Sequence, residues 1–440
     1  MFMNARGWRR AVIATLALLL VATVSYPSSG GAATLPTHDS FYAYSGSTPL
    51  SRVAPGTVLK TRTMPYHFLG IPLPLTAVQI LFRTTNAIGQ PVASVTSVVR
   101  GPGANPGKVI SYQSFYDSLN PNDEPSYAIA GGVSLGGFIP NAEFPIFSSF
   151  LLGGFNIVVP DTEGPTADFS AGPEYGMNTL DAIQAALNSP ATHLSSTAKV
   201  GMIGYSGGAI ATGWAAALAP TYAPNVNKHL VGAAEGGILV DPDHNLHYIN
   251  GSVVWAGVAA MSIIGLARAY HVDLTPYMSA YGKSLFVKLK FASISTVLGA
   301  YPGLTWAKLA KPQYSSPESV PAFVKIANTI NLGSRGAPTI PMFMGQGADG
   351  VLEGTPGFGK GDGVMVAADV RSLARQWCAH GTTVKYTQYN LTSHVTTVPL
   401  WLPAAIAWLG ARFGSSPAPS NCSSIAPGNS LAPISAPTSG

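Results

Sequence analysis

Short apolar runs, separated by loops and helical patterns, recur along much of this chain. Runs of this length, rich in β-branched and aromatic residues, predict buried strands, here at 77–84, 91–99, 108–113, 156–160, 198–203, 339–345 and 383–389. Helical patterns are predicted at 178–187, 209–218, 364–380 and 400–413. Strands that alternate with helices indicate an α/β fold with a mainly parallel sheet. Residues 34 to about 75 show little periodicity, so we expect an irregular N-terminal arm there.

The alternation is interrupted once. From 245 to 333 the pattern is helical, with many apolar and aromatic side chains and no strand-like run. We therefore predict a first core part at 34–244, a helical cap or lid insertion at 245–333 and a second core part at 334–414. Residues 415–440 are rich in Ser and Pro and predict an extended or disordered tail.

The first 33 residues have the pattern of a secretory signal peptide. Arg6, Arg9 and Arg10 precede an apolar stretch at 11–24, which is short for a bilayer span, and small residues then lead to a predicted cut after Ala33. We expect a secreted, extracellular protein, with cell-wall association as a variant, and no transmembrane segment after cleavage. Export favours a disulfide between the two cysteines, Cys378 and Cys422.

The composition limits the classes of substrate and partner that we expect for this chain. Only 10% of residues are charged, against about 25% in ordinary soluble proteins. Such a surface suits an apolar or interfacial substrate, or an extracellular protein built from small polar residues. The net charge of +5 falls to +2 without the three arginines of the predicted signal peptide. The remaining charge is too small for the basic surface that nucleic-acid-binding proteins carry.

Candidate chemistry centres on Ser206. The residues Gly204-Tyr205-Ser206-Gly207-Gly208 spell G-x-S-x-G between the predicted strand 198–203 and the helix 209–218. A serine at such a strand-to-helix turn is a nucleophile elbow, and its flanking glycines prevent a clash in the tight turn. The helix N-terminus that follows favours a developing oxyanion.

The base must come later in the chain. Beyond the loop at His244 and His247, His271 falls in the helical insertion and His380 at the wrong end of the sheet. His394 follows strand 383–389 and precedes the last helix, at the sheet edge where Ser206 also lies. We predict His394 as the base.

Two aspartates compete to orient that base. Asp349 comes directly after strand 339–345, where an imidazole partner belongs, whereas Asp362 stands at the start of the next helix and is explained as well by an N-cap. Strand-end geometry favours Asp349, with Asp362 as the alternative.

The oxyanion hole needs two donors. The backbone N–H of Gly207 is one, and the loop Tyr116-Asp117-Ser118 after an early strand is the predicted source of the other. His244 and His247 with Asp241 and Asp243 are a candidate metal site, but a hinge or rim loop explains this pattern better. We expect no metal and no cofactor.

Several segments together resemble the secretory lipase family, the Candida antarctica lipase A-like α/β-hydrolases. The resemblance covers most of the chain after residue 33 and is carried by 39–42, 78–102, 111–113, 158–165, 204–209 and 393–395, with the Asp161-x-Glu163-Gly164 segment more specific than the elbow. It implies an α/β-hydrolase core, a helical cap over an acyl tunnel, Ser206 as nucleophile and His394 as base.

The resemblance also implies two further assignments and one departure. Asp117 would be the acid whose protonated side chain and backbone stabilise the oxyanion, and Cys378 and Cys422 match a family disulfide. After Asp349 the chain departs from the family pattern, because 350–361 has the composition of an inserted glycine-rich loop. Alignment backwards from Cys378 selects Asp362, and alignment from the strand selects Asp349.

The expected activity is therefore that of a monomeric serine lipase or carboxylesterase, acting on lipid esters such as triacylglycerols, at a lipid–water interface or on dispersed esters. An acyltransferase with the same triad and a hydroxyl acceptor is the alternative enzyme. A non-catalytic surface lipid-binding protein is the alternative of another class.

Overall fold

The computed structural model describes residues 33–414 and 416–435. The predicted signal peptide therefore lies outside the described residues except for Ala33. The described residues from Thr34 onward form one compact unit. Among the described residues, no helix is both long and apolar enough to cross a bilayer.

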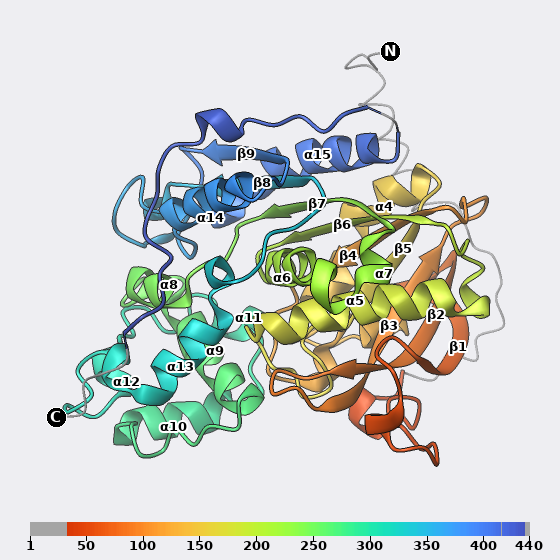
Figure 1. Cartoon of the computed structure of the whole chain (residues 1–440). Helices are drawn as coiled ribbons and strands as arrows, with labels where there is room; N and C mark the ends of the chain where they lie inside the picture. Colours follow the sequence, from red (N-terminus) through yellow and green to blue (C-terminus); the bar gives the residue numbers. More distant parts are fainter. Residues whose placement is uncertain (1–32, 415, 436–440) are drawn as a thin grey trace. The chain divides into compact units, whose positions relative to one another are not determined.

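A single nine-stranded sheet organises this unit (Figure 1). The strand order is β1-β2-β3-β5-β4-β6-β7-β8-β9. The strands from β5 to β9 in this order are parallel, and β1, β2 and β3 form an antiparallel extension. The bounds are β1 Val58–Phe68, β2 Ile71–Thr85, β3 Pro91–Arg100, β4 Lys108–Gln113, β5 Asn156–Pro160, β6 Lys199–Tyr205, β7 Leu230–Gly236, β8 Met342–Gly347 and β9 Val384–Tyr389. The mainly parallel α/β sheet predicted from the alternating pattern is confirmed.

Helices cover both faces of the sheet, because strand side chains alternate between them. Val109 belongs to the apolar core shared with α5, α6 and α14, whereas its neighbour Ile110 belongs to the core shared with α4 and α15. These helices are α4 Phe144–Leu152, α5 Gly172–Asn188, α6 Gly207–Tyr222, α14 Ala367–Ala379 and α15 His394–Arg412. Shorter helices are α2 Pro125–Ile129, α3 Phe138–Ala142 and α7 Pro224–Asn227.

The prediction of an irregular arm over 34–75 is wrong in its second half. β1 and the start of β2 lie there and pair with one another. β1 is an edge strand that carries Pro65 and several polar residues, a composition that edge strands tolerate but that hides the strand pattern. β7 was also missed, since glycine and alanine rather than β-branched residues fill it.

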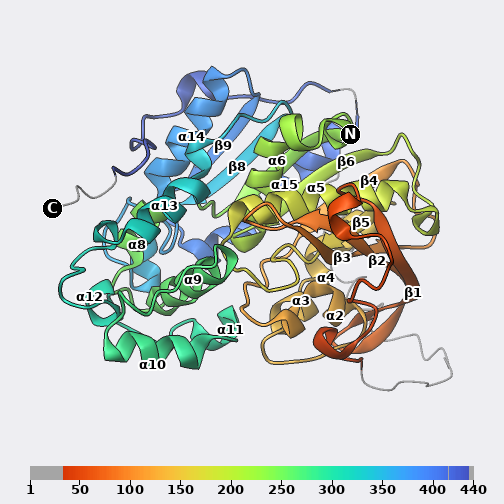
Figure 2. The ribbon, with the colours of Figure 1, turned by 60° about the horizontal axis from the view of Figure 1, so that its bottom comes forward.

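Between 245 and 333 the structure forms helices and loops without a strand. Six helices lie in and just before this segment, and they gather on one side of the unit in both views (Figures 1 and 2): α8 Pro242–Ile249, α9 Ala256–Ala269, α10 Ala280–Leu289, α11 Ile294–Val297, α12 Trp306–Leu309 and α13 Pro321–Ile330. They have their own apolar core, around side chains such as Trp255, Met261 and Trp306.

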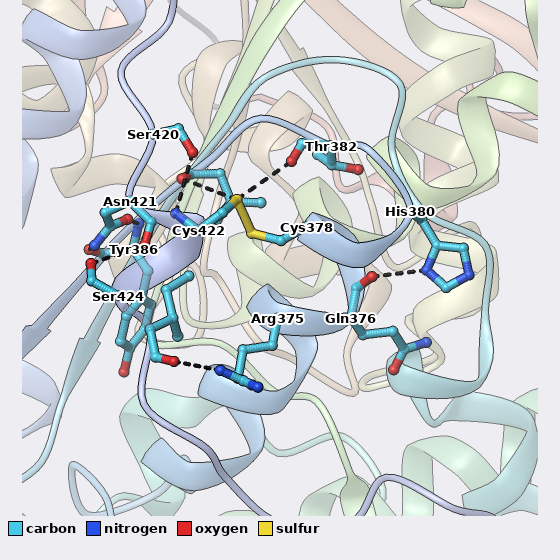
Figure 3. The surroundings of a disulfide bond; sticks show 12 residues. Arg375, Gln376, Cys378, His380, Thr382, Tyr386, Ser420, Asn421, Cys422 and Ser424 are labelled. Atoms are coloured by element: carbon cyan, nitrogen blue, oxygen red, sulfur yellow. Dashed lines mark hydrogen bonds between the residues drawn. A yellow bond between two sulfur atoms is a disulfide. The ribbon is translucent and has the colours of Figure 1, made fainter.

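The C-terminal tail packs against the helices (Figure 1). Cys378 at the end of α14 forms a disulfide with Cys422 (Figure 3). Ile425 is buried in the core beneath α14, and its carbonyl accepts a bond from Arg375 at 2.8 Å. Further on, the backbone N–H and carbonyl of Ile434 bond to the Asn328 side chain of α13 at 2.8 and 3.0 Å.

Candidate functional site

Ser206 lies at the turn from β6 to α6 in a strained backbone conformation. Its φ is +55° and its ψ −119°, a region that residues with a Cβ rarely adopt. The flanking glycines are required sterically. A Cβ on Gly204 would lie 2.1 Å from the carbonyl oxygen of Gly208, and one on Gly208 would lie 2.1 Å from that of Gln113. The sharp turn predicted from the G-x-S-x-G pattern is present.

Asp117 lies directly against this turn. A Cβ on Gly207 would be 1.7 Å from Asp117 Oδ1, so the glycine leaves space for the carboxyl group. Asp117 follows β4 and also has a positive φ, of +36°. Burial raises the pKa of Asp117 to about 8; His394 opposes the shift and Glu143 adds to it. At neutral pH the side chain is therefore mostly protonated and able to donate a hydrogen bond.

A buried glutamate supports the loop that carries Asp117. Both oxygens of Glu163 accept from the Ser118 backbone N–H at 3.2 Å, and Oε1 also accepts from the Tyr175 hydroxyl at 2.8 Å. Burial, together with the nearby Asp117, raises the pKa of Glu163. Glu163, in the Asp161-x-Glu163-Gly164 segment, thus stabilises the loop that carries Asp117 through these hydrogen bonds.

An apolar cavity opens beside Ser206. Side chains from α6, α8, α9 and α13 form most of its wall, and Asp117 and Gly207 border it next to the serine. Its apolar lining includes Phe169, Ile210, Leu239, Leu246, Ile249, Trp255, Val258, Ile263, Leu266, Phe323, Ile330, Val364 and Met365. Such a wall is suited to a hydrocarbon chain.

His394, the first residue of α15, is bonded to Asp362. Its Nδ1 lies 2.7 Å from Asp362 Oδ2, and both side chains are buried. Asp362 is itself fixed from three directions. Its Oδ1 accepts from the backbone N–H groups of Val364 and Met365 at 3.1 and 2.7 Å, and its Oδ2 accepts from Gln346 Nε2 at 2.8 Å. Asp362 is therefore not the N-cap of α14, which begins at Ala367 with Val366 as its N-cap; its carboxylate instead holds the loop before the helix and the histidine.

The preference for Asp349 as the partner of His394 is corrected by this contact. Asp349 starts the 3-10 turn η7 Gly350–Glu353, and its Oδ1 is buried with no hydrogen-bond partner among the described residues. The segment 350–361 leaves the strand end and returns to it, since the Gly350 N–H donates to the Gly361 carbonyl at 2.8 Å. Asp362, which follows this segment, therefore reaches His394, whereas Asp349, which precedes it, does not.

The rest of the His394 ring is enclosed by aromatic side chains. The rings of Tyr205 and Trp255 both lie 5.1 Å from the imidazole, centroid to centroid. Burial alone would lower the pKa of His394, but the carboxylate of Asp362, with that of Glu353, outweighs this effect and raises that pKa. Nε2 is buried and has no hydrogen-bond partner among the described residues, so it is available to a reacting group.

The sequence did not single out Gln346, Trp255 or Glu353. Gln346 lies in β8, just beyond the end of the predicted strand 339–345, and a polar residue next to a buried strand was the available signal. Trp255 and Glu353 lie on a helix start and on a glycine-rich loop, where no local pattern distinguishes them from ordinary residues.

The fold divides the four residues of the candidate metal site, because His247 stays 3.8 Å from Asp243 whereas His244 and Asp241 have other partners. His244 Nδ1 lies 3.0 Å from Asp369 Oδ1, and Asp241 caps α8. Within the described part of the chain, Asp243 and His247 approach Glu318 instead.

The family model for secretory lipases matches residues 131–421, well over half of the chain. The chain belongs to the secretory lipase family. Curated relatives agree with this assignment. Lipase 1 of Candida albicans is 31% identical over 360 residues, which cover 78% of this chain and 73% of that protein. A Mycobacterium tuberculosis protein named probable inactive lipase MT1628 is 31% identical over 390 residues, which cover 87% of this chain and 83% of that protein.

Solved structures agree on the fold. Candida antarctica lipase A in its closed state superposes with a TM-score of 0.78 at 26% identity, over 93% of both chains. A cell-wall degrading esterase, LipA from Xanthomonas oryzae, has a TM-score of 0.58 at 13% identity over 82% of this chain and 99% of the esterase, a likeness of fold alone. This member of the secretory lipase family therefore has the α/β-hydrolase fold, and its family and relatives support a lipase or esterase hydrolase.

Proposed function

We propose that the chain is a secreted serine lipase or carboxylesterase that hydrolyses lipid esters through an acyl-enzyme on Ser206. The observation that carries the proposal is the strained elbow of Ser206, which opens on an apolar cavity and lies against a protonated Asp117. The buried His394–Asp362 pair supplies a base on the same fold.

The chemistry follows from these groups. Ser206 Oγ attacks the ester carbonyl while His394 Nε2 takes its proton, and Asp362 holds the ring and stabilises the imidazolium. The Gly207 N–H and the Asp117 backbone and side chain donate to the oxyanion. The alcohol leaves with the proton from His394. Water, activated by the same ring, then releases the acid.

Two parts of the chain complete the proposal. Residues 1–33 act as a signal peptide that is removed on export, which the secretory family and the apolar stretch 11–24 support. The helical segment 245–333 acts as the cap, since α9 and α13 line the cavity that we assign to the acyl chain. The substrate is a lipid ester, either at a lipid–water interface or dispersed in solution.

A fluorophosphonate probe tests the central step, because it labels only an activated serine. We expect one label on Ser206, located by mass spectrometry, and no label on Ser206→Ala. Fatty-acid release from p-nitrophenyl esters of increasing chain length, compared with emulsified triglyceride, then defines the substrate. An unlabelled wild-type protein that still binds lipid would sink the proposal in favour of a binding protein. Dominant transfer to an added alcohol would replace hydrolysis by acyltransfer.

A further inference from the structure

Glu353 joins three segments of the chain. It ends the turn η7, in the inserted loop after β8. Its Oε2 accepts from the indole Nε1–H of Trp255 at 2.7 Å, and its Oε1 accepts from the backbone N–H of Val395 at 2.8 Å. Trp255 is the N-cap residue of α9 in the helical segment 245–333, and Val395 is the residue after His394. One carboxylate thus links that segment to the start of α15.

The link fixes an aromatic ring against the base. Trp255 is buried, and its ring meets the imidazole of His394 edge-on, at 80° and 5.1 Å between centroids. The same side chain lines the cavity beside Ser206. Because the indole N–H is tied to Glu353, the ring cannot turn away without the loss of a charge-assisted hydrogen bond.

The backbone leaves room for this contact. A Cβ on Gly363 would lie 3.0 Å from Glu353 Oε2 and 3.1 Å from Trp255 Nε1. Gly363 follows Asp362 directly, and its φ of +122° also favours glycine. The carboxylate–indole contact is therefore packed against the residue next to the aspartate that holds His394.

The charge of Glu353 acts on the same ring. The titratable groups that face His394 are Asp362, Glu353 and Asp117; the carboxylates of Asp362 and Glu353 favour its protonated form, and Asp117 adds to this only when it is ionised. Tyr205 adds a hydroxyl that donates to the His394 carbonyl at 2.6 Å. A carboxylate at the N-terminus of α15 is also stabilised by the helix dipole.

We propose that Glu353 is a positioning residue, which clamps Trp255 to the start of α15 and so holds the His394 ring and the adjoining cavity wall in their reactive arrangement. The inference rests on the proposed function. It gives a role to the glycine-rich insertion 350–361, because this segment carries the clamp.

Glu353→Gln tests the clamp. A glutamine presents one oxygen and one N–H₂ group to two donors, so one of the two bonds is lost. We expect kcat for a p-nitrophenyl ester to fall about tenfold or more. The acidic limb of the kcat/KM profile reports the pKa of the free base. Loss of the negative charge disfavours the imidazolium, so this limb moves to lower pH.

Trp255→Phe is the second variant. It keeps an aromatic ring beside His394 but removes the indole N–H together with part of the ring, so we expect a fall in kcat with the acidic limb in place, because the charge of Glu353 remains. If the two residues act as one clamp, the double variant loses little more than Glu353→Gln alone. Glu318→Gln is the matched control, because it removes a carboxylate from the helical segment that is not part of the clamp. We expect it to leave kcat and the acidic limb of the kcat/KM profile unchanged.

The outcomes separate the two claims. Wild-type enzyme that is labelled by the fluorophosphonate, with Glu353→Gln unchanged in kcat and in the acidic limb, overturns the clamp and leaves the proposed function intact. A loss of activity that matches a smaller folded fraction in thermal melts, with the limb unmoved, overturns it equally. Failure of the wild type to label refutes the proposed function instead.

Discussion

Asp362 and His394 are joined by two hydrogen bonds, one between side chains and one between backbones. Asp362 Oδ2 lies 2.7 Å from His394 Nδ1, and the backbone N–H of His394 donates to the Asp362 carbonyl at 2.6 Å. The backbone bond fixes the start of α15 on the loop before α14, so the imidazole is positioned by two independent restraints. If Asp349 replaced Asp362 as the partner of His394, both of these hydrogen bonds would be lost.

This relationship predicts opposite results for the two aspartates. Asp362→Asn keeps the shape of the side chain but favours the wrong histidine tautomer, so kcat should fall about a thousandfold or more. Asp349→Asn should change kcat by no more than a few fold, because its carboxylate does not bond to His394. Steady-state hydrolysis of one soluble ester measures both, with circular dichroism as the check of folding. A large loss in Asp349→Asn alone would reverse the assignment.

The protonation of Asp117 predicts a basic limit to activity. Its pKa is raised to about 8, mainly by burial, so above that pH a carboxylate replaces the donor beside Ser206. A negative charge there opposes the oxyanion, and kcat/KM should fall as pH rises through about 8. Asp117→Asn keeps a donor that does not titrate, and its basic limb should move to higher pH. An unmoved limb in this variant would assign the titration to another group.

Gly207 offers a steric test of the same site. A methyl group at this position would collide with Asp117 Oδ1, so Gly207→Ala should displace that side chain and lower kcat about a hundredfold. Gly410→Ala is the matched control, because a Cβ on Gly410 in α15 would have no neighbour within 4 Å. The control should keep full activity and gain slightly in melting temperature. Equal activity in the two variants would argue against Asp117 as part of the site.

Glu235 predicts a change in stability that is independent of catalysis. It is fully buried on β7, neither oxygen has a hydrogen-bond partner among the described residues, and burial raises its pKa to about 8. Below pH 4.5 both the folded and the unfolded states keep the proton. Between 4.5 and 8 only the unfolded state releases it, so the free energy of unfolding falls as pH rises, and the full cost is present above 8.

Glu235→Gln removes this titration. The variant should be more stable than the wild type at pH 9, on the order of a few kcal/mol, and close to it at pH 4. Urea denaturation at the two pH values measures the difference, with the pH 4 pair as the internal reference. A gain of the same size at both values would show that the carboxyl group does not change protonation on folding.

The sequence was informative wherever one local pattern determined a structure. The elbow at Ser206 and most parallel strands follow from short apolar runs and glycine spacing. The partner of His394 did not, because the choice between Asp349 and Asp362 depends on how the loop 350–361 closes, through a bond between its two ends. β1 and the clamp at Glu353 likewise depend on residues far away in the chain, which no local window contains.

The C-terminal tail limits which helices are able to swing. It is tethered to α14 by the disulfide and to α13 by the bonds between Ile434 and Asn328. An outward motion of α13 would have to break the two hydrogen bonds between Ile434 and Asn328. These bonds do not hold α9 to α11. We therefore expect that any opening of the cavity displaces α9 to α11 more readily than α13.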